Sequence, residues 1–341
     1  MDDSTHIEDD RLEELVGHFL RVIAEVGLLL AITGSVALGA GLALQSKIPL
    51  GDVHGRIDHL ALDSNRQRLF VAELGNDSVG VVDLKQSKVV RTLTGFREPQ
   101  GLGYLPTTDT LYVASGGDGS VRLLRGENLS PAGQIALGDD ADNVRVDDDA
   151  HRVFVGYGKG AIAVIDAQAN IKVTDIPLLG HPEGFRLAAN RIFVNVPDAK
   201  QIAVADRSTN KVVATWSTAD LRSNYPLALD ESGNVLAIFR SPAKIVAFGK
   251  QDGQLLSEAD TCGDSDDLFV DAKRHRVYVS CGDGHLDVFS KPNDQIQRVA
   301  QIQTVMGART SLFVSENDRL YLAVRASGST PAAVWVFRPV D

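Results

Sequence analysis

The dominant feature of the sequence is a short apolar segment that recurs at a nearly constant spacing. The first apolar residue of successive copies stands at positions 69, 111, 153, 192, 235, 277 and 320, so the spacing is 39 to 43 residues. The copies are Arg68–Ala72, Thr110–Ala114, Arg152–Gly156, Arg191–Asn195, Asn234–Ile238, Arg276–Ser280 and Arg319–Ala323. A fixed period of this length is typical of stacked repeat architectures. The sequence therefore predicts seven structurally equivalent units.

Each unit has the pattern of four short β-strands. In the first unit, the expected strands are Ile57–Leu62, Arg68–Glu73, Ser78–Leu84 and Lys88–Leu93. Gly, Asn and Asp residues between them are typical of the tight turns of an antiparallel meander. The third strand is apolar on both faces, which is expected when a sheet is packed between two neighbouring sheets. The predicted fold is all-β, a seven-bladed β-propeller of four-stranded antiparallel blades.

The seventh unit indicates how the ring closes. After its third strand, Ala333–Phe337, only Arg338–Asp341 remain, which is too short for a fourth strand. Near the other end of the chain, Lys47–Gly51 resembles the fourth-strand ending Asp175–Gly180. We therefore expect the N-terminal strand to join the last blade, which removes the open sheet edges of the array. Residues 46–341 are then a single propeller domain.

The preceding residues 1–45 have a different character. They hold eight acidic residues and two arginines, and their first part has the apolar spacing of an amphipathic helix. Residues 26–46 carry no charge and contain Gly41-Leu42-Ala43, a small-x-small pattern that suits signal peptidase. We interpret this segment as an export signal of a periplasmic or secreted protein. The alternative is a retained membrane anchor formed by residues 26–46.

The charge of the chain narrows the choice of partner. The formal net charge is -11, and the sequence contains no run of lysine and arginine. The electrostatic signature of a nucleic-acid or anionic-lipid binder is therefore missing. We expect no nucleic-acid partner, and contact with a membrane only through the N-terminal segment if that segment is not cleaved.

The chain has two cysteines, Cys262 and Cys281, and no C-x-x-C-H haem-attachment motif. In the predicted propeller, Cys262 follows a fourth strand and Cys281 ends the second strand of the next blade. Both then lie at the same face of adjacent blades. A disulfide in an oxidising compartment and two buried free thiols both remain open.

The repeat residues resemble those of a known group of proteins. Leu111-Tyr112-Val113-Ala114, the turn Gly117-Asp118-Gly119-Ser120 and the strand Val79-Gly80-Val81-Val82-Asp83 are similar to the YVTN-type repeats of the YncE-like secreted seven-bladed β-propellers. The resemblance covers residues 46–341. It implies a periplasmic or surface binding scaffold and no particular reaction.

Candidate chemistry lies in the linkers between blades. In a four-stranded meander, these linkers lie on the same face as the turns between second and third strands. Aligned on the next apolar residue, one linker position reads Asp58, Gln100, Asp142, Glu183, Tyr225, Asp266 and Thr310. Four carboxylates would thus surround one mouth of the channel, and crowded carboxylates need a cation, a basic partner or a raised pKa. The alternative is that these linkers are polar only because solvent covers them.

On the first interpretation, this face holds a pocket for a polar ligand or a cation. The candidate ligand-binding residues are Arg56, Asp58, His59, Glu98, Gln100, Asp140, Asp142, Asn143, His181, Glu183, Tyr225, Asp264, Asp266, Asp267 and Arg309. Among them, Arg56, His59, His181 and Arg309 would supply positive charge or carry protons.

Two functions fit these residues. The first is a non-enzymatic exported propeller that binds a small polar ligand, a cation or a partner protein at the linker face, with no cofactor other than a divalent cation. The second is a lactonase-type hydrolase that uses the carboxylates at the channel mouth together with His and Arg. The second function rests on analogy between propeller folds. Neither the ligand nor the oligomeric state follows from the sequence.

Overall fold

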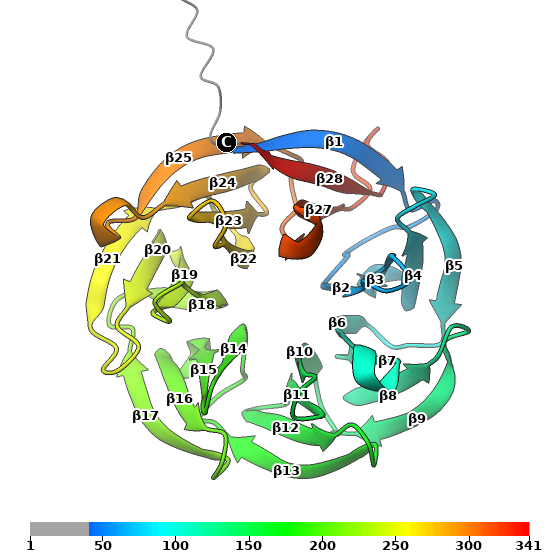
Figure 1. The fold of residues 1–341 in the computed structure, drawn as a ribbon, viewed down its shortest axis with the longest axis horizontal. Helices are drawn as coiled ribbons and strands as arrows, with labels where there is room; N and C mark the ends of the chain where they lie inside the picture. Colours follow the sequence, from blue (N-terminus) through cyan, green and yellow to red (C-terminus); the bar gives the residue numbers. More distant parts are fainter. Residues whose placement is uncertain (1–40, 341) are drawn as a thin grey trace, which may run out of the picture. The chain divides into compact units, whose positions relative to one another are not determined.

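A computed structural model of the chain describes residues 41–340. Within this range, the strands form seven four-stranded sheets, and Figure 1 shows them arranged as blades around a central axis. All neighbouring strands within the sheets are antiparallel; the pairs β2–β3 and β3–β4 of blade 1 are examples. The all-β seven-bladed propeller of four-stranded antiparallel blades is therefore confirmed.

The strand bounds follow the predicted repeat closely. Blade 1 has β2 (Leu60–Asp63), β3 (Arg68–Glu73), β4 (Ser78–Asp83) and β5 (Lys88–Thr94). Blade 2 has β6 (Pro99–Leu105), β7 (Thr110–Ser115), β8 (Ser120–Arg125) and β9 (Ser130–Ala136). Blade 3 has β10 (Ala141–Asp147), β11 (Arg152–Tyr157), β12 (Ala161–Asp166) and β13 (Ile171–Pro177). Blade 4 has β14 (Phe185–Ala188), β15 (Arg191–Val196), β16 (Gln201–Asp206) and β17 (Lys211–Ser217).

Blade 5 has β18 (Arg222–Leu229), β19 (Val235–Ser241), β20 (Ala243–Phe248) and β21 (Leu255–Asp260). Blade 6 has β22 (Ser265–Asp271), β23 (Arg276–Cys281), β24 (His285–Ser290) and β25 (Gln297–Gln303). Blade 7 has β26 (Ser311–Val314), β27 (Arg319–Val324), β28 (Ala333–Val340) and β1 (Gly41–Pro49). Short 3₁₀ turns occur at η1 (Leu74–Asn76), η2 (Pro106–Thr108), η3 (Pro197–Ala199), η4 (Pro292–Asp294) and η5 (Ser315–Asn317). Among the residues described, no helix is long and apolar enough to cross a bilayer.

Packing between blades explains why the inner strands are apolar on both faces. One core cluster, for example, joins Phe70 and Val79 of blade 1 to Leu102 and Val113 of blade 2. Equivalent clusters lie between every other pair of neighbouring blades, including the last and the first. The outermost strands, such as β5, have only one row of buried positions and are otherwise exposed. Burial of both faces of every inner strand is the main source of stabilisation of the ring.

The ring closes as predicted, through antiparallel pairing of β1 with β28, in which Ile48 is opposite Val334. The strand begins at Gly41, before Ser46, the predicted first residue of the propeller domain. Leu42 is 6% exposed and packs with Trp335 and Phe337. The whole predicted signal-peptidase pattern Gly41-Leu42-Ala43 therefore lies inside a paired strand. The predicted helical segment at the N-terminus lies outside the described residues.

The linkers and the second-to-third-strand turns share one face, as the repeat pattern predicts. The Gly75 amide donates to the Arg56 carbonyl at 2.9 Å, and the Gly158 amide donates to the Asp140 carbonyl at 3.0 Å. On the same face, Cys262, just after β21, is joined to Cys281 at the end of β23 by a disulfide with an S–S distance of 1.97 Å. This bond links blades 5 and 6.

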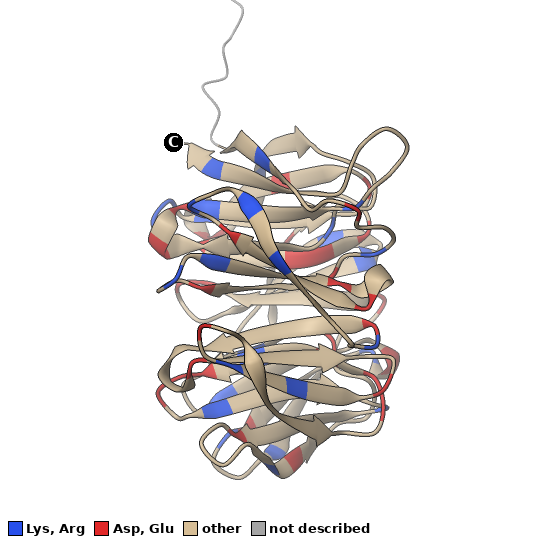
Figure 2. Cartoon of the chain, turned by 90° about the vertical axis from the view of Figure 1, so that its right-hand side faces the viewer, with Lys and Arg blue, Asp and Glu red and all other residues tan. Residues whose placement is uncertain are grey.

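Ion pairs connect neighbouring blades on the opposite face. Arg66 donates to Asp109 of the next blade at 2.7 Å and to Asp63 of its own blade at 3.2 Å. In blade 6, Arg274 makes the corresponding contacts with Asp271 and with Asp318 of blade 7. Figure 2 shows residues of both charge signs interspersed along the side of the ring that faces the viewer. These ion pairs have a structural role in holding adjacent sheets in register.

Because Leu42 is buried in the strand that closes the ring, Leu42→Ala should destabilise the protein, although Leu42 is part of the predicted cleavage pattern. Loss of this buried side chain should lower the free energy of unfolding by about 2–5 kcal/mol in urea denaturation. Leu44→Ala is the matched control because Leu44, two residues further along β1, is 45% exposed. The control should change stability by less than about 0.5 kcal/mol. Equal effects of the two substitutions would show that β1 does not pack as described.

Candidate functional site

The linkers bring residues from distant parts of the sequence to the axis. A small cavity of about 30 Å³ lies there, at the mouth on the linker face. Of the predicted residues, those that line it are Arg56, Asp58, His59, Asp142, Asn143, Glu183, Tyr225, Asp266 and Asp267. We call this cavity the acid chamber. Its carboxylates come from the first strands of blades 1, 3, 4 and 6 and from the linkers that precede these strands. They meet because each first strand begins at the same level along the axis.

The remaining predicted residues lie on the same face but outside the lining. Glu98 is exposed. Gln100 donates to Asp140 at 3.0 Å, and His181 lies 3.8 Å from the other oxygen of Asp140. Asp264 and Arg309 lie beside the chamber. Arg309 pairs with Asp264 and with Asp266, which lines the chamber.

Two arginines neutralise the acids on the blade 6 side. Arg240 contacts Asp264 at 3.1 Å and Asp266 at 2.7 Å, and Arg309 contacts the same two carboxylates at 2.8 and 2.9 Å. The Arg240 guanidinium also stacks over the Tyr225 ring, 4.0 Å from its centre. Burial raises the pKa of Asp266, although Arg309 and Arg240 act against this rise. On this side of the mouth, two arginines therefore already neutralise the charges of Asp264 and Asp266.

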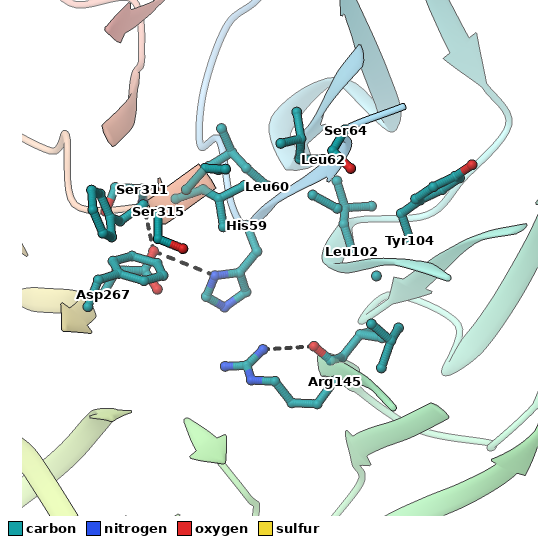
Figure 3. Close-up of a pocket in the computed structure, with 18 of the residues that line it drawn as sticks. His59, Leu60, Leu62, Ser64, Leu102, Tyr104, Arg145, Asp267, Ser311 and Ser315 are labelled. Atoms are coloured by element: carbon teal, nitrogen blue, oxygen red, sulfur yellow. Dashed lines mark hydrogen bonds and ion pairs between the residues drawn. The ribbon is translucent and has the colours of Figure 1, made fainter. Parts of the chain in front are cut away.

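On the blade 1 side, the acids also have cationic partners. Asp58 is 1% exposed, and its carboxylate lies 2.7 Å from Arg56. His59 lies 3.8 Å from Asp267, as Figure 3 shows. Burial acts to lower the pKa of His59, but the carboxylates of Asp267, Asp58 and Asp142 outweigh it and raise the pKa to about 10. With this pKa, His59 carries a positive charge at neutral pH and offsets part of the negative charge of the chamber.

Besides its contact with His59, the Asp267 carboxylate has a second contact that fixes its position. Its carboxylate accepts the Ser311 amide at 2.7 Å, while the Ser311 hydroxyl lies 2.7 Å from the Ser280 hydroxyl. The Ser311 hydroxyl is thus engaged with another serine and not with His59. A serine–histidine nucleophile pair is not assembled here.

Asp142 and Glu183 differ from the other acids. Asp142 is 8% exposed, and its Oδ1 has no hydrogen-bond partner among residues 41–340. Over the same range, no hydrogen bond or ion pair satisfies the Glu183 carboxylate. Burial raises the pKa of Asp142 to about 6, with His59 opposing and Asp58 adding to the rise. Burial together with the charges of Asp142 and Asp266 raises the pKa of Glu183 to about 8.

Sequence reasoning missed three arginines at the site. Arg145 and Arg186 line the inner side of the acid chamber, and Arg240 clamps Asp264 and Asp266. Arg145 and Arg186 could have been found, since the equivalent positions in the other units are apolar or small: Ala61, Gly103, Ala228, Phe269 and Phe313. Arg240 lies in β19, in the unit that departs most from the repeat.

The geometry does not favour a divalent cation at the mouth. Among the described residues, the one group of three His, Cys, Asp or Glu side chains whose donor atoms all lie within 4.8 Å is Cys262, Cys281 and Asp283. Two of these form the disulfide, so their sulfur atoms are not thiolate ligands. The carboxylates of the acid chamber are too far apart to form such a set.

The raised pKa of Glu183 predicts an effect on stability. A carboxyl group whose pKa is higher in the folded state binds more protons there, so stability falls as pH rises from the unfolded value towards about 8. Glu183→Gln removes this loss, and the variant should be increasingly more stable than the wild type between about pH 5 and pH 8. Urea denaturation at several pH values measures the difference. Glu98→Gln, an exposed glutamate of the same face, should stay within about 0.5 kcal/mol throughout. A constant offset for Glu183→Gln would contradict the raised pKa.

Comparison with known proteins supports the fold and goes no further. No protein-family model matches the sequence, and no curated protein matches it. Among solved structures, hydrazine synthase of Kuenenia stuttgartiensis is similar with a TM-score of 0.67 and 16% identity, covering 91% of this chain and 99% of that chain. The WD40 repeats of RRP9 are similar with a TM-score of 0.74 and 9% identity, covering 89% and 98%.

A chain of the mitotic checkpoint complex is similar with a TM-score of 0.71 and 16% identity, covering 88% of this chain and 97% of that chain. At these identities the likeness concerns the arrangement of strands. The chain is thus a seven-bladed β-propeller that is similar in fold to the WD40 and hydrazine synthase propellers.

Proposed function

We propose that this protein is an exported, non-enzymatic β-propeller that binds a positively charged group at the acid chamber. The observation that carries the proposal is the buried Asp142 carboxylate, whose Oδ1 is without a partner, next to Glu183. A buried carboxylate without a hydrogen bond is costly, and an arriving donor removes that cost. An ammonium or guanidinium group supplies both the donors and the charge.

The size of the chamber restricts what can enter. Its volume is about 30 Å³. One water molecule needs roughly 10–15 Å³ by the same measure, so the chamber accepts only a small head group. The rest of the ligand would remain at the surface, against the linkers. A free amine and a lysine or arginine side chain of a partner protein share this chemistry.

Two expectations about family and location belong to the same proposal. Seven in-phase repeats with the YVTN-type strand and turn residues support a place among the YncE-like propellers. The disulfide between Cys262 and Cys281 supports an oxidising compartment, because such bonds persist in the periplasm or outside the cell. Export through the N-terminal segment, whether cleaved or retained as an anchor, agrees with that compartment.

The binding proposal is tested with butylammonium as the probe and butanol as its neutral analogue, by NMR titration of the protein. Butylammonium should bind and butanol should not. Its affinity should increase roughly ten-fold or more between pH 6 and pH 9, because Glu183 must lose its proton. Asp142→Asn and Glu183→Gln should each weaken binding by roughly ten-fold or more. Glu127→Gln, an exposed glutamate in the turn between β8 and β9 on the opposite face, is the control and should bind as the wild type does.

A short peptide with a central lysine, titrated in parallel, distinguishes a free amine from a protein side chain. Tighter binding of the peptide would identify a partner protein. Binding of butylammonium that depends neither on pH nor on Glu183 would contradict the proposal.

One observation favours a lactonase-type hydrolase as the second candidate. With a pKa of about 8 for Glu183 and about 6 for Asp142, one carboxyl holds a proton at pH 7 while the other is largely ionised, as an acid–base pair requires. We expect no opening of an aldonolactone above the spontaneous rate, with or without added divalent metal. Turnover that is lost in the Asp142→Asn, Glu183→Gln double variant would instead establish the hydrolase.

A further inference from the structure

A second and larger cavity lies in the channel beyond the acid chamber. Its volume is about 570 Å³, within the range of small-molecule sites. Figure 3 shows His59, Asp267 and Arg145 among the residues that line this cavity. Ser64, Ser315 and Glu316 line it near the first-to-second-strand turns. We call it the channel cavity.

The channel cavity is open to solvent, and its wall combines polar groups with apolar side chains. The apolar side chains come from the inner strands of blades 1, 2, 3, 6 and 7 and include Leu60, Leu102, Val144, Phe269, Leu312 and Phe313. This apolar part favours a ligand with an apolar body, because water released from both surfaces contributes to binding.

Two guanidinium groups line the cavity, and within residues 41–340 neither forms a hydrogen bond or an ion pair with a carboxylate. Arg145 donates to the carbonyls of Phe185 and Val144 at 2.9 and 2.8 Å, and to the Asn143 amide oxygen at 3.0 Å. Arg186 donates to the Phe185 carbonyl at 3.0 Å and reaches the Leu268 carbonyl at 3.5 Å. All of these acceptors are neutral.

Both arginines therefore keep positive charge and free donors. A guanidinium has five N–H groups, and the bonds just described use three of Arg145 and two of Arg186. Asp267, the carboxylate that lines the channel cavity beside them, already contacts the Ser311 amide and His59. Burial and the charge of Arg186 lower the pKa of Arg145 to about 9, although the charges of Asp267 and Asp142 act against this fall.

We propose that the channel cavity binds a small organic carboxylate, with its carboxylate group on Arg145 and Arg186 and its apolar body along the channel wall. Arginine forks match carboxylate geometry and pair with it in two parallel hydrogen bonds. Glu316 lines the cavity near its other end and disfavours a second negative charge on the ligand. A monocarboxylate with an aliphatic chain can pair with the two arginines and places no second negative charge near Glu316. The channel cavity shares His59, Arg145, Arg186 and Asp267 with the acid chamber, but the proposal does not require a cation to be bound there.

The experiment compares octanoate with octanamide on the full-length protein by isothermal titration calorimetry. The two probes have the same chain and differ in charge. Octanoate should bind at least ten-fold more tightly than octanamide. Arg145→Gln and Arg186→Gln should each reduce octanoate affinity at least ten-fold and leave octanamide unchanged. Arg338→Gln, an exposed arginine on β28, is the matched control and should have no effect.

Circular dichroism checks that each variant is folded. If Arg145→Gln does not fold, the Arg186→Gln variant and the comparison of the two probes on the native protein decide the matter. Equal affinity for octanoate and octanamide, no octanoate binding at 10 mM, or octanoate binding that Arg186→Gln leaves intact would each overturn the proposal.

Discussion

The structure depends on the burial of both faces of every blade against its neighbours. No single four-stranded sheet of this sequence can bury its inner strands alone, so each requires the next, and the last requires the first. The pairing of β1 with β28 completes blade 7, which then packs against blade 1 through Ile48, Leu60 and Val334. Closure also determines where chemistry can occur, because it carries the start of every inner strand to one axis.

That convergence creates an electrostatic problem which the protein solves only in part. Carboxylates from different linkers meet in a space that holds little water, and burial makes their charged forms costly. Arg240 and Arg309 offset this cost for Asp264 and Asp266, and Arg56 does so for Asp58. Asp142 and Glu183 receive no such partner. Within residues 41–340 these two carboxyls thus bear the cost of burial without a compensating cation, and the binding proposal rests on them.

The repeat pattern predicted the fold from sequence because periodicity reports directly on burial. The same pattern predicted which face the linkers share, and so brought Asp58, Asp142, Glu183 and Asp266 to one mouth. It could not predict which acids are paired, since that depends on side-chain direction across blades. Arg240 shows the difficulty: it lies on a second strand, yet reaches two carboxylates of the next blade.

The start of β1 was also beyond sequence reasoning. Gly41 and Leu42 belong to an uncharged run whose composition favours an export signal, and nothing local distinguishes a cleaved segment from a strand. Only the partner strand does so, because β28 extends to Val340 and offers a backbone for pairing at Gly41. Where local sequence is ambiguous, the tertiary partner decides the structure.

Arg145 and Arg186 separate two cavities of opposite character. Carboxylates without partners lie on one side, and guanidinium donors without carboxylates lie on the other. The two sides influence each other electrostatically, since Asp142 acts to raise the pKa of Arg145. If both proposed ligands bind, a cation at Asp142 and an anion at Arg145 change each other's affinity, and by thermodynamic linkage the two changes are equal.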